Sequence, residues 1–199
     1  MDTDKTEIIL DNEVKGKTLL LLAKDYYMGK GVPCNRQIAK KFFIESATFG
    51  NDMAMYMLAR IYEEEGNYIE ARKWALESSK LGNGEAVCFL GATYYFGEGV
   101  ECDLTKAKEC FEEAIKLGST EAMCNLGKMY YFGYGVPQNY DESLKLFDEA
   151  AKSGNLDARK FLNCAKIGHV STNIKNGRKR LLSYLKKRKQ NKKRHNRKS

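Results

Sequence analysis

Side chains that commonly carry out catalysis are few in this sequence, and their spacing fits none of the common active sites. Its six cysteines form no C-x-x-C pair, and its two histidines, His169 and His195, stand far from any zinc-ligand spacing. G-x-G-V occurs three times, from Gly29, Gly97 and Gly133, without the further glycine or lysine of a phosphate-binding loop. Such glycines are more typical of helix ends. We therefore predict a protein that is not an enzyme and that needs neither a metal nor a cofactor.

Tyrosines and bases form the group of side chains best suited to binding. Residues of one type recur 36 residues apart, as in Tyr95 and Tyr131, or 68 apart, as in Tyr27 and Tyr95, so a repeating helical structure would place them on one face. Aromatic residues and arginine favour the centres of protein interfaces, and the bases suit a partner with some acidic character. We predict a groove for an extended or helical peptide, lined by Lys24, Tyr27, Tyr56, Arg60, Tyr95, Lys128 and Tyr131. For Tyr95 and Tyr131, packing against their own loops is the alternative.

The elements that would position these residues follow from a repeat of 36 residues. Residues 16–51, 84–119 and 120–155 align without a gap, and residues 52–83 align once four residues are left out. A fixed period of this length is typical of stacked helix pairs, in which each repeat covers the apolar face of its neighbour. We therefore divide the chain into an N-terminal extension, four repeats, a half-repeat with a loop, and a basic C-terminal segment: 1–15; 16–51, 52–83, 84–119 and 120–155; 156–177; and 178–199.

Each repeat shows the pattern of two helices joined by a turn. In the first helix apolar residues recur three and four positions apart, as in Ala122, Leu126 and Tyr130. A small residue beside the leucine, such as Gly91 or Gly127, would let two helices approach closely. The first glycine of each G-x-G-V fits the left-handed position that ends a helix. Residues with helix-capping side chains then precede the second helices: Asn35, Asn67, Asp103 and Asn139.

Two of the cysteines, Cys88 and Cys124, occupy the same position in successive repeats. We predict that they are buried as small apolar side chains. A redox or metal-binding pair contributed by neighbouring repeats is the alternative. Because no secretory signal is evident, we expect the thiols to be reduced.

These residues also resemble a known family. The pattern A-x3-LG-x2-Y-x2-G-x-GV-x2-(D/N)-x3-A-x2-(W/F)-x3-A-x2-G is similar to the Sel1-like repeat, a relative of the tetratricopeptide repeat, over residues 16–155, with a half-unit at 156–168. Residues 52–83 depart from it, because EEEGNY replaces the glycine loop. The resemblance implies an all-α, right-handed solenoid whose first helices line a concave face. It also implies an adaptor that binds a protein partner.

The net charge of +8 conceals a division between the repeats and the C-terminus. Residues 175–199 carry 13 of the 34 Lys and Arg residues and no acid, which leaves residues 1–174 with a net charge of −5. Leu181, Leu182 and Leu185 share one stripe of a helix predicted over 178–190, which would cap the last repeat. As alternatives, the bases could contact an import receptor, bind RNA or DNA without base choice, meet anionic lipid, or fold back onto the acidic repeats. These bases include Arg178, Lys179, Arg180, Lys186, Lys187, Arg188, Lys189, Lys192, Lys193 and Arg194.

Apolar runs in the sequence are short. None approaches the roughly 20 residues that a membrane helix needs. We predict a monomeric cytoplasmic protein, with the nucleus or nucleolus as the alternative location if the basic segment acts as an import sequence.

Overall fold

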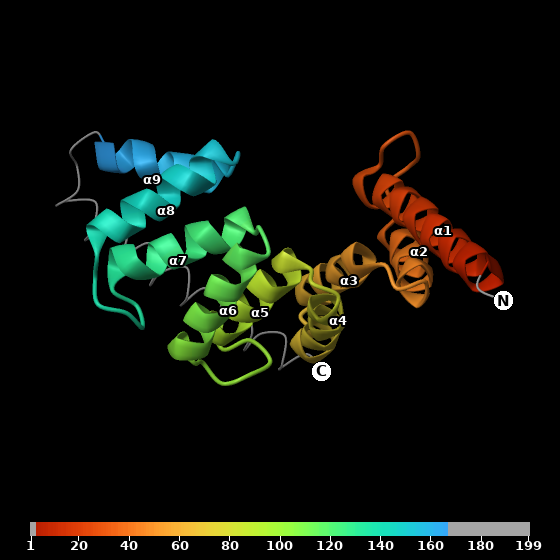
Figure 1. Cartoon of the computed structure of the whole chain (residues 1–199), viewed down its shortest axis with the longest axis horizontal. Helices are drawn as coiled ribbons and strands as arrows, with labels where there is room; N and C mark the ends of the chain where they lie inside the picture. The colour runs from red at the N-terminus through yellow and green to blue at the C-terminus, as the bar shows by residue number, and fades with distance from the viewer. Residues whose placement is uncertain (1–2, 167–199) are drawn as a thin grey trace. The chain divides into compact units, whose positions relative to one another are not determined.

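The computed structural model describes the backbone of residues 3–166 and the side chains of residues 11–163. Over this range the chain forms nine α-helices and no strand (Figure 1). The all-α prediction is therefore confirmed. The helix predicted at 178–190 and the basic segment lie outside the described residues.

The helices belong to two compact units, and the division between the units falls within α5. The first unit, residues 1–86, contains α1 (Thr3–Met28), α2 (Arg36–Thr48), α3 (Asp52–Glu64) and α4 (Tyr68–Lys80). The second unit, which begins at Val87, contains most of α5 (Gly84–Phe96), then α6 (Leu104–Lys116), α7 (Thr120–Phe132), α8 (Tyr140–Lys152) and α9 (Leu156–Lys166). Within the units α1 packs against α2, α3 against α4, and α8 against both α7 and α9 (Figure 1).

The first helix is twice as long as most of the others. α1 has 26 residues where α2 has 13, because the predicted N-terminal extension is helical from Thr3 and runs into the first repeat without a break. A close contact at Gly16 holds α1 to α2: a Cβ there would lie 3.2 Å from the Cβ of Phe49. The Ser46 hydroxyl donates a hydrogen bond to the Gly16 carbonyl at 2.7 Å. Gly16 therefore belongs to the packed part of the first repeat.

Capping side chains begin the second helices as predicted. The Asn139 side chain accepts a hydrogen bond from the Glu142 backbone N–H at 3.1 Å. Asp103 accepts from the N–H groups of Thr105 and Lys106, and the bond from Lys106 is the main reason why the pKa of Asp103 lies below its usual value. The remaining predicted caps bond in the same way, at Asn35 and Asn67.

Replacing Asn139 with alanine should lower the free energy of unfolding by about 1 kcal/mol, because the first turn of α8 loses an acceptor. Asn139→Gly should cost only about a few tenths of a kcal/mol, since water reaches the N–H groups that glycine leaves open. Urea denaturation of both variants measures the difference. Equal losses for alanine and glycine would show that the cap contributes nothing of its own.

Left-handed glycines end the first helices, as the sequence predicts. Gly133 follows α7 with φ +70°, and its N–H bonds to the Met129 carbonyl at 2.9 Å. The second glycine of the motif, Gly135, is also left-handed at φ +70°, and a Cβ on it would lie 2.5 Å from the Cβ of Leu104. The loop of the fourth repeat therefore packs directly on the start of α6.

The small residues predicted to permit close helix approach do so. A Cβ on Gly91 would lie 2.8 Å from the ring of Phe111, and one on Gly127 would lie 2.9 Å from the ring of Phe147. Both rings are buried at the centre of apolar clusters in the second unit. The two phenylalanines therefore occupy the space that the glycines leave.

Cys88 and Cys124 are buried in the same clusters, each 2% exposed. The prediction that they pack as small apolar side chains is confirmed. Burial also raises the pKa of the Cys124 thiol. Among the described residues, no three His, Cys, Asp or Glu side chains lie close enough together to hold a metal ion.

Candidate partner-binding surface

The seven predicted binding residues are all partly buried, and each unit contains a set of them. In the first unit, Lys24 and Tyr27 lie on α1, and Tyr56 and Arg60 lie on α3. In the second unit, Tyr95 lies on α5, and Lys128 and Tyr131 lie on α7.

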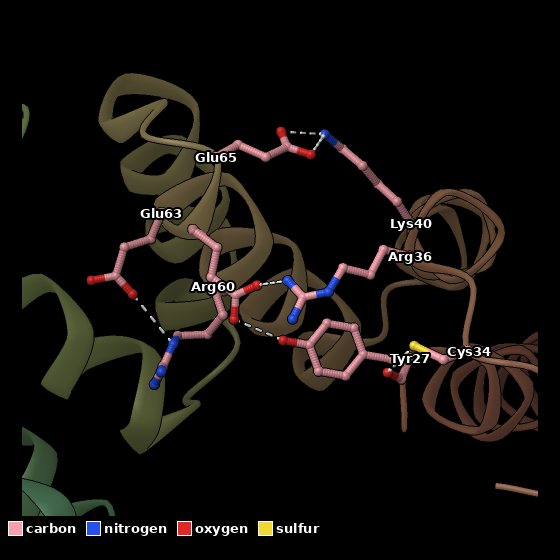
Figure 2. A network of polar contacts seen from close by, with 8 residues as sticks. Tyr27, Cys34, Arg36, Lys40, Arg60, Glu63 and Glu65 are labelled. Atoms are coloured by element: carbon pink, nitrogen blue, oxygen red, sulfur yellow. Dashed lines mark hydrogen bonds and ion pairs between the residues drawn. The ribbon is translucent and has the colours of Figure 1, made fainter. Parts of the chain in front are cut away.

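Tyr27 is held in a polar network in the first unit (Figure 2). Its hydroxyl donates a hydrogen bond to Glu64 at 2.8 Å, and Glu64 also pairs with Arg36, whose guanidinium lies 5.2 Å from the centre of the Tyr27 ring. Burial, together with the Glu64 carboxylate, raises the pKa of Tyr27. The thiol of Cys34 closes the following loop by donating to the Tyr27 carbonyl at 3.4 Å. The Tyr27 side chain therefore links α1 to α2 and to the end of α3.

Arg60 contacts polar groups of its own helix. Its Nη1 donates to the Tyr56 hydroxyl at 3.3 Å. Its Nε lies 3.4 Å from the Glu63 carboxylate (Figure 2). Tyr56 and Arg60 therefore form one polar group on α3. Lys24, on α1, makes no ion pair with any residue that the structure describes.

An acidic turn, Glu63–Glu65, gathers bases in the first unit. Besides the contacts of Glu63 and Glu64, the carboxylate of Glu65 pairs with Lys40 on α2 at 2.7 Å (Figure 2). The Lys40 ammonium also lies 3.8 Å from the centre of the Tyr62 ring. EEEGNY replaces the glycine loop here, and no role of these glutamates was predicted from the sequence. The feature that could have predicted a role for them is the run of three acids at the one loop that departs from the repeat pattern.

Tyr95 and Tyr131 pack against other aromatic side chains. The Tyr95 ring lies 4.9 Å from that of Phe96 and 6.4 Å from that of Tyr134, and burial raises the pKa of Tyr95 far above its usual value. The centre of the Tyr131 ring lies within 6.5 Å of the centres of four other rings: Phe132, Tyr140, Phe147 and Phe161. Both rings thus have a packing role, and partner contact through them stays a prediction.

Lys128 has a different environment. Its ammonium donates to the Asn125 side-chain oxygen at 3.2 Å and lies 5.7 Å from the centre of the Phe161 ring on α9. The Asn125 amide nitrogen lies 3.6 Å from the Cys88 sulfur on α5. No carboxylate lies within ion-pair distance of Lys128 in the part of the chain with described side chains. Residues of α5 and α9 therefore contact the Asn125 and Lys128 pair on α7 from either side.

Neither Asn125 nor Phe161 was predicted from the sequence to be a binding residue. Asn125 is the polar member of a repeat position that otherwise holds Leu21, Met57, Phe89 and Phe161. A polar residue at this otherwise apolar position was the one feature of the sequence that could have pointed to Asn125. It becomes meaningful only when the amide is seen to contact the neighbouring lysine.

The repeat geometry is shared with known proteins. A family model of the Sel1 repeat matches residues 18–50, 52–83, 84–119 and 120–155. The chain belongs to the Sel1 repeat family. The match confirms the resemblance found in the sequence. Sel1 repeat proteins are generally scaffolds for protein–protein interaction.

Solved structures of other Sel1 repeat proteins show the same fold. A Sel1 repeat protein from Oxalobacter formigenes superposes with a TM-score of 0.68 at 22% identity, over 78% of this chain and 65% of that one. The protective antigen c5321 of uropathogenic Escherichia coli superposes with a TM-score of 0.59 at 24% identity, over 74% of this chain and 32% of its own. This Sel1 repeat chain therefore spans less than two thirds of either structure. A comparison with curated proteins found no match.

Two further properties bear on where a partner could bind. Within the described residues, no helix of this Sel1 repeat protein has both the length and the apolar character that crossing a membrane requires. The bases predicted to act from the C-terminal segment, Arg178 to Arg194, lie outside the described range, and their roles stay predictions.

Proposed function

We propose that this Sel1 repeat protein is a non-catalytic scaffold that binds a peptide or protein segment through side chains on the first helices of its repeats. The family supports an interaction role, because its members are generally scaffolds. The proposed contact residues are the bases Lys24, Arg60 and Lys128, with Tyr27 and Tyr56 beside them in the first unit.

The observation that carries the proposal is the contrast between the paired lysines of three second helices and two unpaired lysines on first helices, Lys24 and Lys128. The lysines of α4, α6 and α8 each pair with an acid three or four residues away, as in Lys80 with Glu77 at 2.6 Å and Lys152 with Asp148 at 2.5 Å. Lys24 and Lys128 are partly buried on first helices, and no carboxylate of the described residues pairs with them. A partly buried ammonium that has no counter-charge attracts an incoming acid more strongly than one already paired. The first-helix face is therefore the better surface for an acidic partner.

Neutralising these bases should weaken partner binding. Proteins retained by the immobilised full chain would be identified, and their affinity would be measured for wild type and for the double variant Lys24→Gln, Lys128→Gln. We expect the double variant to bind with about tenfold or more lower affinity, because both substitutions remove charge from the contact surface. Glutamine is uncharged, polar and only one atom shorter, and both lysines are only partly buried, so thermal unfolding should be unchanged.

A matched control is the double variant Lys80→Gln, Lys152→Gln, which removes the same charge from exposed second-helix ion pairs. Exposed pairs of this kind contribute little to stability. Equal affinity of the wild type and the Lys24, Lys128 variant would refute the proposed surface. An equal loss in the control would show that net charge, rather than this surface, attracts the partner.

The compartment in which such a scaffold works stays the predicted one, the cytoplasm. The alternative function, import or nucleic-acid binding through the basic segment, depends on residues outside the described range and stays a prediction.

A further inference from the structure

We infer that Lys128 and Asn125 form a binding site for a carboxylate, which an acidic side chain within a bound peptide supplies. The inference rests on the scaffold function proposed above and adds the chemical group that the second unit recognises. It follows from the contacts around the Lys128 ammonium.

The Lys128 ammonium is held in place by neutral groups. They are the Asn125 oxygen at 3.2 Å, the Phe161 ring, whose centre lies 5.7 Å away, and the Cys124 thiol, with which Lys128 shares a side-chain hydrogen bond. The nearby carboxylate of Asp157 is engaged by Lys160 at 3.0 Å, which is the main cause of the lowered pKa of Asp157. The charge of Lys128 therefore stays available while its position is restrained.

The Asn125 amide supplies a second donor with a defined direction. Because its oxygen accepts from Lys128, its nitrogen is turned toward Cys88, where it meets a sulfur at 3.6 Å. A thiol sulfur is a weak acceptor, whereas a carboxylate oxygen is a strong one. One carboxylate could thus accept from the Lys128 ammonium and from the Asn125 N–H, which lie one helical turn apart. A neutral amide ligand would gain much less from the ammonium.

The position of the site favours a side chain in the middle of a peptide. Cys88 on α5 and Phe161 on α9 flank the site on the two neighbouring first helices of the second unit. A bound chain can therefore continue over both neighbours, and the Phe161 ring offers apolar contact to the stem of an acidic side chain. A chain terminus would leave one of these flanks unused.

The combination occurs once among the four repeats. The positions equivalent to Lys128 hold Lys24, Arg60 and Ala92, and the positions equivalent to Asn125 hold apolar residues throughout. A base and an amide donor are found together in the fourth repeat alone. The inferred specificity for a carboxylate is therefore a property of the second unit.

A short peptide that carries one acid tests the inference directly. The probe is the acetylated, amidated nonapeptide Gly-Ala-Ser-Ala-Glu-Ala-Ser-Ala-Gly, and its counterpart has Gln in place of Glu. Both are titrated into the full chain labelled with nitrogen-15, and the side-chain amide signal of Asn125 and the backbone amide signals of α7 are followed. We expect saturable shifts with the Glu peptide and about tenfold weaker binding of the Gln peptide. Equal binding of the two peptides would overturn the inference.

Variants assign the effect to the site. Lys128→Met and Asn125→Leu should each weaken the Glu peptide about fivefold or more, while Lys152→Met, which removes an exposed charge, should leave its affinity unchanged. Backbone signals away from residues 125–128 report whether each variant is folded. An unchanged affinity of folded Lys128→Met would refute the site.

The origin of the carboxylate is tested with the Gln peptide carrying a free C-terminus. If it binds as tightly as the Glu peptide, the site takes chain ends and the inferred side-chain origin is wrong. Failure of the scaffold proposal is separately visible. If the Glu peptide binds but captured proteins keep full affinity for Lys128→Met, the carboxylate site stands and the scaffold contacts lie elsewhere. If the peptide fails and captured proteins lose affinity, the scaffold surface stands and the carboxylate site falls.

Discussion

Replacing Gly135 with alanine should lower the free energy of unfolding by about 3 kcal/mol. Part of the loss is backbone strain, because Gly135 has φ +70° and a left-handed residue with a Cβ costs about 1–2 kcal/mol. The rest is steric: the new Cβ would lie 2.5 Å from the Cβ of Leu104, an atom that no side-chain rotation can move away. The loop or the start of α6 would therefore have to shift. Urea denaturation measures the loss.

Alanine substitutions at two other glycines measure the cost of backbone strain without the steric clash. Gly31 occupies the same repeat position with φ +74°, and Gly118 lies in the same unit as Gly135 with φ +88°. A Cβ on either would meet nothing within 4 Å. Alanine at these two positions should therefore cost about 1–2 kcal/mol, the strain alone. If Gly135→Ala lowers the free energy of unfolding no more than Gly31→Ala and Gly118→Ala do, the loop does not pack on Leu104 as described.

Gly127→Ala should destabilise the protein by about 1–2 kcal/mol, although helix propensity predicts the opposite sign. Alanine in the interior of α7 would gain about 1 kcal/mol over glycine from propensity. Its Cβ would, however, lie 2.9 Å from one ring carbon of Phe147 and 3.0 Å from another. Because Phe147 is 1% exposed, the ring has no free space to move into, and overpacking of this kind costs about 1–3 kcal/mol. The collision therefore outweighs the propensity.

A double variant checks this explanation. Phe147→Leu removes the ring atoms that the new methyl group would meet, so Gly127→Ala should be at least about 1 kcal/mol less damaging in that background. Thermal or urea unfolding of the wild type, both single variants and the double variant gives the coupling. Stabilisation by Gly127→Ala alone, or strict additivity of the two changes, would show that α7 and α8 do not pack as closely as described.

Features that depend on neighbouring residues in the chain were predictable from the sequence. Asn139 caps α8 through a backbone group three residues ahead, and Gly133 ends α7 through a carbonyl four residues behind. Such interactions need only the local backbone conformation, so residue type and spacing are enough to predict them. The 36-residue period likewise predicts which residues occupy equivalent positions in successive helices.

The acidic turn shows where this local reasoning stops. That Glu63–Glu65 departs from the repeat is visible in the sequence, but its partners are not. Arg36 lies 28 residues before Glu64, and Lys40 lies 25 residues before Glu65. The pairs form because α2 packs against α3, and the short turn brings its carboxylates to the bases of α2. No spacing within the repeat predicts that match.

The period of the chain thus predicted the helix pairs, their ends and the face on which Lys128 would lie. The packing of successive repeats decided whether a side chain on that face is covered or available. Tyr95 and Tyr131 share one repeat position, yet the first meets Tyr134 and the second meets Phe147 and Phe161. Repeats share a backbone geometry but not their side chains. Burial, pairing and charge at equivalent positions are therefore set by residues distant in sequence, from 16 positions for Phe147 and Tyr131 to 37 for Cys88 and Asn125.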